Sequence, residues 1–541
     1  MAPKKTPKSG ARAWRVLLIV AANAVCLFLL WRLVFAAHGG PDTEARAATG
    51  AASASEEPTT APRPLRQRDT KLEGRIRAAI AEGERKANSI SKGRVTPGEC
   101  TVSVHVRELG TDGEIVSIDA DRAMRPASNL KLVTSAAALV LMGPDGRFET
   151  VFESTGRVSE GVLTGDLVAH AGGDPLYDRD AQGDVTRLLA PLVDGLRLQG
   201  VRRITGALVL DEGTFLQPGP GPAWPGESQH WQEFCALSGG FNVNAGCLTA
   251  FVRATQPGRP ADVDVRPHGH GLARRVDVQT GPAKSKLDVR VGVQGDAVRV
   301  GGSIPSSVPS WEGRFAAPDP VVLFGGAVLD ALNRAGIQVD GGVVRERRAV
   351  QADSRVLARL VTPLVDVLGP INTYSNNACA DQLFLTMGRW QIGQGTREGG
   401  RAATARALEM LGLDAQSLVQ VDGSGLSRDN RISARQITGL VDAVLRRDPR
   451  AAQAFRDSLA VGGETGTLDR RLGALEGRVH AKTGFIGGTS ALSGILDARD
   501  GRVLVFSILV EYPNVEGLNT NCWKPMQDDI CEALAGLHGT G

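Results

Sequence analysis

One segment, residues 125–143 (RPASNLKLVTSAAALVLMG), constrains the fold of this chain more than any other. It begins near a proline and a serine and continues as an apolar run with helical spacing, which predicts a helix packed against a core. Ser128 lies at the start of this helix and Lys131 lies three residues further on, so both side chains share one face. Ser128 is therefore either a helix cap or a nucleophile with a lysine base beside it.

The nucleophile hypothesis has a clear chemical basis. A serine hydroxyl attacks a carbonyl only when a base removes its proton, and Lys131 can be that base if burial and a second cation lower its pKa. The N-terminus of the helix adds free N–H groups and positive potential for an oxyanion. The spacing alone is weak evidence, because residues 89–92 (SISK) repeat it in an ordinary polar stretch.

A second short motif lies in TYSNNACADQL, where Ser375, Asn376 and Asn377 form a Ser-x-Asn. A hydroxyl and a carboxamide at this spacing can relay a proton and orient a substrate amide. Serine and asparagine also favour turns, so a simple helix cap is the alternative.

A third motif lies in VHAKTGFIGGTSALSG, where Lys482, Thr483 and Gly484 begin a strand-like run. The lysine supplies positive charge, the threonine supplies a hydroxyl, and the glycine lets the backbone approach a substrate. An exposed strand end is the alternative for this motif taken alone.

The length of 541 residues is too great for one ordinary core and predicts two or more domains. Hydrophobic residues make up 42% of the chain and charged residues 22%, which indicates a globular protein. The formal charge of +3 is small for this length, and many positive residues lie at the N-terminus. A nucleic-acid partner is therefore not indicated.

The N-terminus predicts a location outside the cytoplasm. A basic tail precedes residues 16–31 (VLLIVAANAVCLFLLW), a run that is long for a signal peptide and close to the length of a membrane span. The basic tail is expected to stay in the cytoplasm, which sends the remaining chain outside. An uncleaved anchor is the first interpretation, and a cleaved signal peptide is the alternative because Ala36 and Ala37 follow the run.

No metal site or cofactor is predicted. The eight histidines are scattered, and the closest pair, His268 and His270, lies in a Gly-rich loop. The spacings of the cysteines do not resemble a zinc site. Outside the cytoplasm the six cysteines after the apolar run permit disulfides, whose pairing stays open. These six are Cys100, Cys235, Cys247, Cys379, Cys522 and Cys531.

The three motifs occur in the order found in β-lactamases and penicillin-binding proteins. Their flanks, among them GVLTGDLVAHAGGDPL, ITGALVLDEGTF, VDGSGLSRDNRIS and GGETGTLDRRL, resemble the D-alanyl-D-alanine carboxypeptidase/endopeptidase family. This family comprises the low-molecular-mass class C penicillin-binding proteins, and the likeness runs from about residue 72 to near the C-terminus. It implies an α+β, penicillin-recognising transpeptidase/β-lactamase-like fold: an antiparallel sheet covered by helices, a buried serine helix and a large β-rich insertion.

Composition and resemblance together divide the chain into segments. The segment after the apolar run is rich in Ala, Thr, Pro and Glu, as a flexible linker is. Between about residues 151 and 344, short β-like runs alternate with Gly and Pro turns. We predict a basic tail with an anchor or signal segment (1–37), a linker (38–70), the first part of a transpeptidase-like domain (71–150), a β-rich insertion of two nested subdomains (151–344) and the second part of the domain (345–541).

The resemblance implies a role for each residue of the reaction centre. Ser128 is the acylating nucleophile and Lys131 is its general base. Ser375 and Lys482 pass the proton to the leaving D-alanine, and Asn377 holds the substrate amide.

It also implies a set of substrate contacts. Thr483 and Lys482 bind the terminal carboxylate, and Gly484 belongs to the same substrate-binding strand. The backbone N–H groups of Ser128 and Phe485 form the oxyanion hole. The DGSGLSRDN segment is expected to form a loop beside the site.

The implied activity is that of a serine D,D-peptidase that cleaves peptidoglycan stem peptides through an acyl-enzyme and is acylated by β-lactam antibiotics. Family members usually carry Thr or Ser at the position of Phe485, so a hydroxyl for the carboxylate is missing and endopeptidase action on cross-links is favoured. A β-lactamase would need a deacylating glutamate motif, and none is recognised. The alternative from another class is a catalytically impaired envelope protein that binds peptidoglycan or β-lactams.

Overall fold

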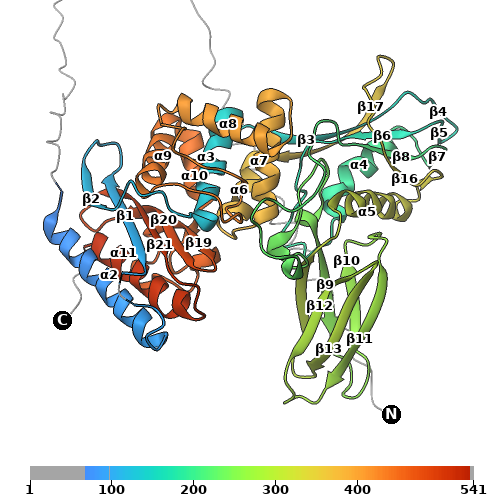
Figure 1. Ribbon diagram of the computed structural model, residues 1–541. Coiled ribbons are helices and arrows are strands. Elements are labelled where there is room, and N and C mark those ends of the chain that lie inside the picture. Colours follow the sequence, from blue (N-terminus) through green and yellow to red (C-terminus); the bar gives the residue numbers. More distant parts are fainter. Residues whose placement is uncertain (1–67, 97, 537–541) are drawn as a thin grey trace, which may run out of the picture. The chain divides into compact units, whose positions relative to one another are not determined.

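The part of the chain that carries the motifs is built around one antiparallel sheet of six strands (Figure 1). The computed structural model describes residues 68–96 and 98–536. The strand order is β18-β19-β20-β21-β1-β2, and each strand is antiparallel to its neighbours. The strands are β1 (Thr101–Glu108), β2 (Glu114–Ile118), β18 (Ala460–Val461), β19 (Val479–Ile486), β20 (Thr489–Asp497) and β21 (Val503–Glu511).

This sheet separates two hydrophobic cores. Successive side chains of a strand point to opposite faces, so an apolar strand buried on both sides contributes to both cores. In β20, Ala491 and Ile495 belong to one core, whereas Leu492 and Leu496 belong to the other. β20 is buried on both faces at every position from Thr489 to Leu496, which fits a strand in the middle of a covered sheet.

Helices cover both faces of the sheet (Figure 1). Nearly every residue of α3 is buried, including Lys131, because α3 packs against α7, α8 and α9. The predicted α+β fold with a buried serine helix is thus confirmed. Within the described residues, the face that α3 covers carries six helices, namely α3 (Leu130–Met142), α6 (Leu364–Asn372), α7 (Asn377–Ile392), α8 (Arg397–Met410), α9 (Ala434–Arg447) and α10 (Pro449–Asp457). The other face is covered by α2 (Thr70–Ile90) and α11 (Lys524–Leu534).

Short helical turns connect several of these elements. They are η1 (Ala127–Asn129), η2 (Glu227–Gln229), η3 (Glu233–Cys235), η4 (Asn244–Gly246), η5 (Gly466–Leu468), η6 (Gly473–Leu475) and the π-helical η7 (Asn519–Trp523). Three of them, η1, η3 and η5, carry residues of the candidate site.

The segment between α3 and α6 is rich in β-structure. It contains a five-stranded sheet (β16-β8-β6-β3-β17), a four-stranded sheet (β15-β7-β5-β4) and two three-stranded sheets (β10-β9-β14 and β11-β13-β12). Two helices accompany them, α4 (Thr186–Leu198) and α5 (Pro320–Arg334). The strands are β3 (Arg147–Ser154), β4 (Val158–Ser159), β5 (Val162–Leu163), β6 (Leu167–His170), β7 (Arg203–Ile204), β8 (Leu208–Asp211), β9 (Cys247–Arg253), β10 (Asp262–Arg266), β11 (Ala273–Gly281), β12 (Asp288–Gln294), β13 (Ala297–Pro305), β14 (Ser310–Ala316), β15 (Gln338–Val339), β16 (Val343–Arg345) and β17 (Arg355–Pro363).

The first and last strands of this β-rich segment reach beyond the bounds expected for it, residues 151 and 344. β3 and β17 pair with each other and complete the five-stranded sheet, although β3 begins before residue 151 and β17 lies after residue 344. Both strands lead directly into the helices of the motif-bearing part. The division of the chain into domains at residues 151 and 344 stays a prediction.

The predicted membrane anchor or signal segment at residues 16–31 lies outside the described residues. Among the residues that the structure describes, no helix combines the length and the apolar character needed to cross a bilayer. The six cysteines predicted to permit disulfides are all buried and free in the structure.

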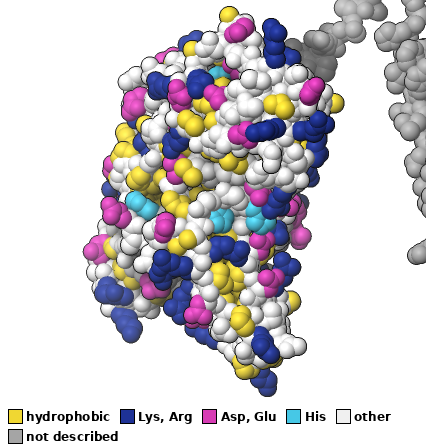
Figure 2. Space-filling view, turned by 90° about the vertical axis from the view of Figure 1, so that its right-hand side faces the viewer, with side chains coloured by type: hydrophobic (Ala, Val, Ile, Leu, Met, Phe, Trp, Pro, Cys, Tyr) yellow, Lys and Arg dark blue, Asp and Glu magenta, His cyan; other side chains and the backbone are white. Residues whose placement is uncertain are grey.

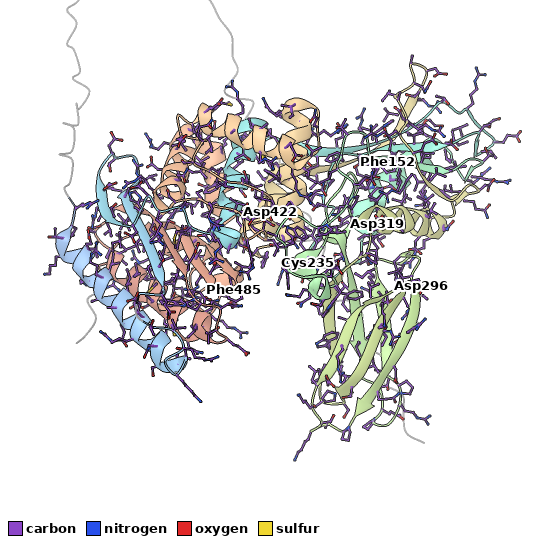
Figure 3. The ribbon with its side chains drawn as sticks, viewed as in Figure 1. Phe152, Cys235, Asp296, Asp319, Asp422 and Phe485 are labelled. Atoms are coloured by element: carbon purple, nitrogen blue, oxygen red, sulfur yellow. The ribbon has the colours of Figure 1, made fainter. Side chains whose placement is uncertain are left out.

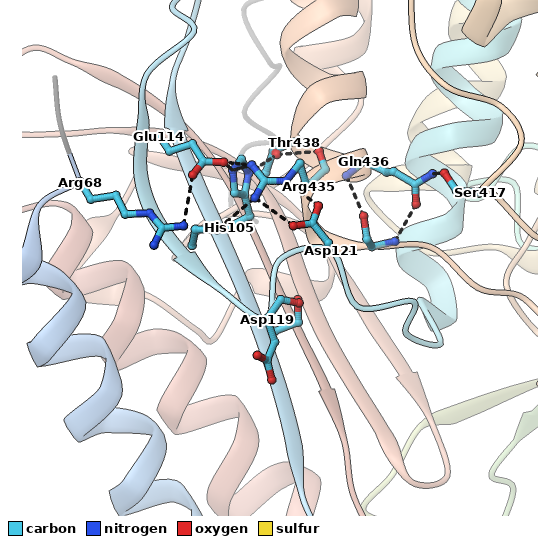
Figure 4. A network of polar contacts seen from close by, with 12 residues as sticks. Arg68, His105, Glu114, Asp119, Asp121, Ser417, Arg435, Gln436 and Thr438 are labelled. Atoms are coloured by element: carbon cyan, nitrogen blue, oxygen red, sulfur yellow. Dashed lines mark hydrogen bonds and ion pairs between the residues drawn. The ribbon is translucent and has the colours of Figure 1, made fainter. Parts of the chain in front are cut away.

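A polar network ties the first hairpin to α9 (Figure 4). His105 of β1 is buried, and its Nδ1 lies 2.5 Å from Thr438 Oγ1 of α9. Arg435 of α9 contacts Glu114 of β2 and donates from Nε to Asp121 Oδ1 over 2.6 Å. These contacts join segments that lie far apart in the sequence.

The face that carries the insertion presents basic and acidic side chains in alternation with small apolar areas (Figure 2). Charges of both signs are interspersed, as they are on an ordinary solvated surface.

Candidate active site

Ser128 lies in η1, directly before the first residue of α3. The residue at the N-cap of α3 is Asn129, whose side chain makes no capping hydrogen bond. Lys131 Nζ instead donates to Ser128 Oγ over 2.9 Å. The hydroxyl of Ser128 is therefore engaged by the lysine, as the nucleophile hypothesis requires, and the cap hypothesis does not describe its position.

Lys131 is buried, and its ammonium group meets three acceptors. Besides Ser128 Oγ, Nζ donates to Asn377 Oδ1 and to the carbonyl oxygen of Ser424, each over 2.7 Å. Burial lowers the pKa of Lys131 to about 8, while the carboxylates of Asp381 and Asp422 oppose this change. An amine with this pKa is partly neutral near pH 7, and a neutral amine can accept the proton of Ser128.

In the Ser-x-Asn motif, Asn376 acts as a helix cap, whereas Asn377 reaches Lys131. Asn376 caps α7, since its side chain accepts a hydrogen bond from the N–H of Cys379 over 2.9 Å. Asn377 is the first residue of α7, and besides contacting Lys131 it donates from Nδ2 to the carbonyl of Phe234 over 2.8 Å. Its amide group has a second N–H that remains available to a substrate carbonyl.

Ser375 occupies a strained backbone conformation, with φ of 63°. A non-glycine residue in this left-handed region costs free energy and persists only where its surroundings hold it. The structure holds Ser375 next to Asn377, which reaches Lys131. Within the described residues, the Ser375 hydroxyl has no hydrogen bond to Lys131 or Lys482.

Lys482 and Thr483 lie side by side on β19. Lys482 is buried, and burial together with the charge of Lys131 holds its pKa well below the ordinary value. Its Nζ donates to the Thr483 carbonyl over 2.9 Å, and Asn129 Nδ2 donates to the Lys482 carbonyl over 2.8 Å. Thr483 Oγ1 donates to Thr467 Oγ1 over 2.9 Å, which brings a further hydroxyl from η5 to the motif.

β19 presents a free strand edge at this site. β18 pairs with β19 only at His480 and Ala481, so on that side Lys482 to Ile486 have no partner strand in the described chain. An unpaired edge can accept an extended peptide as an additional strand. Phe485 belongs to this free edge, and its side chain is 60% exposed (Figure 3).

Two glycines allow the other segments to press against the turn that holds Ser128. A Cβ at Gly484 would lie 2.9 Å from the carbonyl oxygen of Pro126. A Cβ at Gly425 would lie 1.8 Å from the carbonyl oxygen of Ala127, and Gly425 has φ of 82°. Both positions therefore need glycine for close approach, and Gly425 needs it for its backbone conformation as well.

The loop 422–430, expected beside the site, supplies the Ser424 carbonyl to Lys131. Asp422 holds the loop together, because its carboxylate accepts from the N–H groups of Gly425 and Ser427 and from Asn430 Nδ2. Asp422 Oδ2 also accepts a hydrogen bond from Trp224 Nε1 over 3.2 Å, and Trp224 belongs to the segment between α3 and α6.

The structure thus brings Ser128, Lys131 and Asn377 into direct contact and places Lys482, Thr483, Gly484 and Phe485 on the strand that packs against η1. Several residues of the site were not singled out from the sequence. These are Thr467, Asp381, Asp422, Ser424 and Phe234. The flanks GGETGT and DGSG contained three of them, and their glycines were the available signal.

The chain is similar to known D-alanyl-D-alanine carboxypeptidases. The D-alanyl-D-alanine carboxypeptidase of Actinomadura sp. (strain R39) is 32% identical over 425 residues, covering 75% of this chain and 77% of that protein. The D-alanyl-D-alanine carboxypeptidase DacB of Haemophilus influenzae is 25% identical over 427 residues, covering 76% of this chain and 85% of that protein.

The fold is also that of a solved relative. The crystal structure of penicillin binding protein 4 from Haemophilus influenzae covers 83% of this chain and 98% of its own, with 23% identity and a TM-score of 0.67. The model of the D-Ala-D-Ala carboxypeptidase 3 (S13) family matches residues 91–528, most of the folded chain. The chain therefore belongs to the D-Ala-D-Ala carboxypeptidase 3 (S13) family.

Proposed function

We propose that this serine D,D-peptidase cleaves the D-alanyl-D-alanine end of peptidoglycan stem peptides through an acyl-enzyme on Ser128. The observation that carries the proposal is the position of Lys131 Nζ, which lies 2.9 Å from Ser128 Oγ and 2.7 Å from Asn377 Oδ1. A base of lowered pKa touching a hydroxyl is what an activated serine nucleophile requires. Membership of the family and the names of its relatives support the same activity.

In the acylation step, neutral Lys131 takes the proton of Ser128 as Oγ bonds to the carbonyl carbon of the penultimate D-alanine. The N–H groups of Ser128 and Phe485 stabilise the oxyanion that forms. The C–N bond then breaks, and Ser375 and Lys482 pass the proton to the departing nitrogen. The product is an ester on Ser128, which water hydrolyses with Lys131 again as the base.

Substrate contacts follow from the free edge of β19. The second N–H of Asn377 Nδ2 binds a substrate carbonyl, while its first N–H stays on Phe234. The terminal carboxylate is bound by Lys482 and Thr483, and the hydroxyl of Thr467 supports Thr483 from 2.9 Å. Gly484 keeps β19 close enough to Ser128 for one peptide to reach both.

We infer an extracytoplasmic location, because peptidoglycan lies outside the cytoplasm and the relatives are named for its D-alanine ends. We also propose that residues 16–31 tether the chain to the membrane, on the strength of their length and basic flank. β-Lactams are expected to acylate Ser128, and a Haemophilus influenzae structure of the same fold is described as complexed with a β-lactam.

Release of D-alanine from a synthetic pentapeptide tests the activity. The wild-type protein should release it from a peptide ending in D-Ala-D-Ala but not from one ending in D-Ala-L-Ala. Lys131→Met should lower the rate by about 10²–10⁴-fold, the usual contribution of a general base. Equal release from both peptides, or full activity of Lys131→Met, would contradict the proposal.

Phe485 bears on the balance between carboxypeptidase and endopeptidase action. Its exposed ring replaces a hydroxyl that could bind a terminal carboxylate, so cleavage of cross-linked peptides is expected to be favoured. Phe485→Thr should raise the kcat/KM of D-alanine release several-fold, with a smaller change for cross-linked dimers. The two rates are compared by chromatography of the products, and an unchanged ratio would show that Phe485 does not set the preference.

A further inference from the structure

A polar pocket of about 550 Å³ opens beside the Ser-x-Asn motif. Tyr374, Ser375 and Asn377 form one wall, and residues of the β-rich segment, among them Arg179 and Arg314, form the other. Pockets that bind small ligands typically measure about 300–1,000 Å³, so this one has the size of a binding site. It offers far more room than a single alanine needs.

On one wall of the pocket, the side chain of Arg314 is held by contacts within that wall. Arg314 Nε donates to Glu233 Oε1 over 2.7 Å, and its Nη1 donates to Asn244 Oδ1 over 2.9 Å. The guanidinium carbon also lies 4.8 Å from the centre of the Tyr177 ring. Glu233 offsets the charge of Arg314, and each of its three nitrogens donates a hydrogen bond to Glu233 or Asn244. Arg314 is therefore less suited than an unpaired arginine to bind an anionic ligand.

Arg179 differs from Arg314 in that its charge is available. Its guanidinium carbon lies 4.1 Å from the centre of the Tyr374 ring, which holds the group at the pocket beside the motif. Its side chain is 53% exposed, and its ion pair with Asp180 spans 3.9 Å to a side chain that is 95% exposed. Such exposed pairs contribute little, so the guanidinium is free to bind a carboxylate of a ligand.

The position of Ser375 indicates which part of a substrate reaches this pocket. In the proposed function, Ser375 helps to protonate the nitrogen that departs when the C–N bond breaks. Ser375 lines the pocket, so the amine side of the scissile bond lies next to it. When D-alanine is the leaving group, it ends there. When the substrate is a cross-linked dimer, the leaving group is a second peptide, called here the leaving strand, which continues further and carries carboxylates.

We propose that the pocket binds the leaving strand of cross-linked peptides and that Arg179 holds one of its carboxylates. This inference rests on the proposed function, because it needs the acyl group on Ser128 and the amine beside Ser375. Cleavage transfers the acyl group to Ser128 Oγ and a proton to the nitrogen, which leaves the second peptide as a free amine in the pocket. Arg179 is thus a specificity-determining residue for cross-links.

Three variants of the full chain separate charge from packing. Arg179→Met keeps an apolar stem over Tyr374 but removes the charge, and Arg179→Lys returns a charge without the planar fork. Arg275→Ala changes an exposed arginine of β11 that does not line the pocket and serves as the matched control. Each variant is assayed for D-alanine release from a pentapeptide, for cleavage of a purified cross-linked dimer and for acylation by benzylpenicillin.

Arg179→Met should lower kcat/KM for the dimer about tenfold, the usual effect of losing one hydrogen bond to a charged group. D-alanine release should change less than threefold, Arg179→Lys should recover part of the loss, and Arg275→Ala should match the wild type. The liberated leaving strand, added as an inhibitor of D-alanine release, should inhibit Arg179→Met more weakly than the wild type.

Three results would overturn the inference. The first is an equal loss of dimer cleavage and D-alanine release in Arg179→Met. That result would show that the pocket binds the acyl-side peptide common to both substrates, or that Arg179 only supports Tyr374. The second is no loss of either activity, and the third is a wild type that releases D-alanine but does not cleave dimers. Failure of the proposed function looks different: the wild type would not be acylated by benzylpenicillin at all.

Discussion

Lys131 is the residue on which the chemistry of this site depends. It is buried beside two carboxylates, Asp381 and Asp422, which favour its charged form, while burial favours its neutral form. Burial has the larger effect, and the pKa of Lys131 falls to about 8. The rate of acylation by benzylpenicillin should therefore rise with pH, increase about tenfold per pH unit below 8 and level off above it.

Asp381 should tune this dependence. Its Oδ1 accepts from the N–H of Gly423 over 2.8 Å, a bond that Asn can keep, and its charge raises the pKa of Lys131. In Asp381→Asn the pKa of Lys131 falls further, so more of the amine is neutral near pH 7.5, where the Asp381 carboxyl of the wild type is charged although burial raises its pKa to about 7. The inflection of the acylation rate against pH should move to lower pH.

Asp429→Asn is the matched control for this experiment, because Asp429 is an exposed carboxylate of the same loop. It should leave the profile where the wild type has it. An inflection that stays in place or moves to higher pH in Asp381→Asn would contradict the electrostatic role of Asp381.

At the residue scale, the sequence revealed those parts of the site that lie close together along the chain. Ser128 and Lys131 share a helix face, and Asn377 follows Ser375 by two positions. Asp381 and Thr467 were not predicted, because each acts on a residue that only folding brings near. Thr467 reaches Thr483 through the turn η5, whose backbone N–H at Thr467 donates to Thr373.

At the scale of elements, periodicity predicted the helices and strands because each is apolar in a regular pattern. α3 and β19 occur where the sequence placed a helix and a strand-like run. The start of α3 was less predictable, since the chain forms η1 at Ser128 before the helix begins. Ala127 there has φ of 46°, a strained conformation that depends on the packing of Gly425 and Gly484 around it.

Because His105 of the β1–β2 hairpin is buried against α9, the free energy of unfolding should fall in acid. Burial, aided by the positive charge of Arg435, lowers the pKa of His105 to about 3. Above pH 6.5 the residue is neutral in both the folded and the unfolded chain. Below that pH only the unfolded chain takes up the proton, so the free energy of unfolding falls by at most about 1.4 kcal/mol per pH unit, down to about pH 3.

Urea unfolding at pH 7.5 and at pH 5.0 measures this effect. The wild type should lose about 2 kcal/mol more between the two pH values than His105→Gln does, the difference expected from 1.5 pH units below the ordinary pKa. The same loss in both proteins would show that His105 does not couple folding to pH.

At the scale of the whole molecule, the long β-rich segment followed from the short β-like runs and the Gly and Pro turns between α3 and α6, and the α+β class followed from the family resemblance. The partners of its strands did not, because sheets form between segments that are distant in the chain. β3 pairs with β17 across the whole segment, a register that no local pattern encodes. The same holds for the contact of Phe234 with Asn377, through which this segment reaches the site.

The most direct test of this account is the intact mass of the purified protein after incubation with benzylpenicillin, beside its Ser128→Ala variant. The wild type should gain one adduct of the mass of benzylpenicillin, and the variant, with an unchanged circular dichroism spectrum, should gain none. An adduct on Ser128→Ala, or no adduct on the folded wild type, would contradict the assignment of Ser128 as the nucleophile, and the second result would favour a non-catalytic envelope protein.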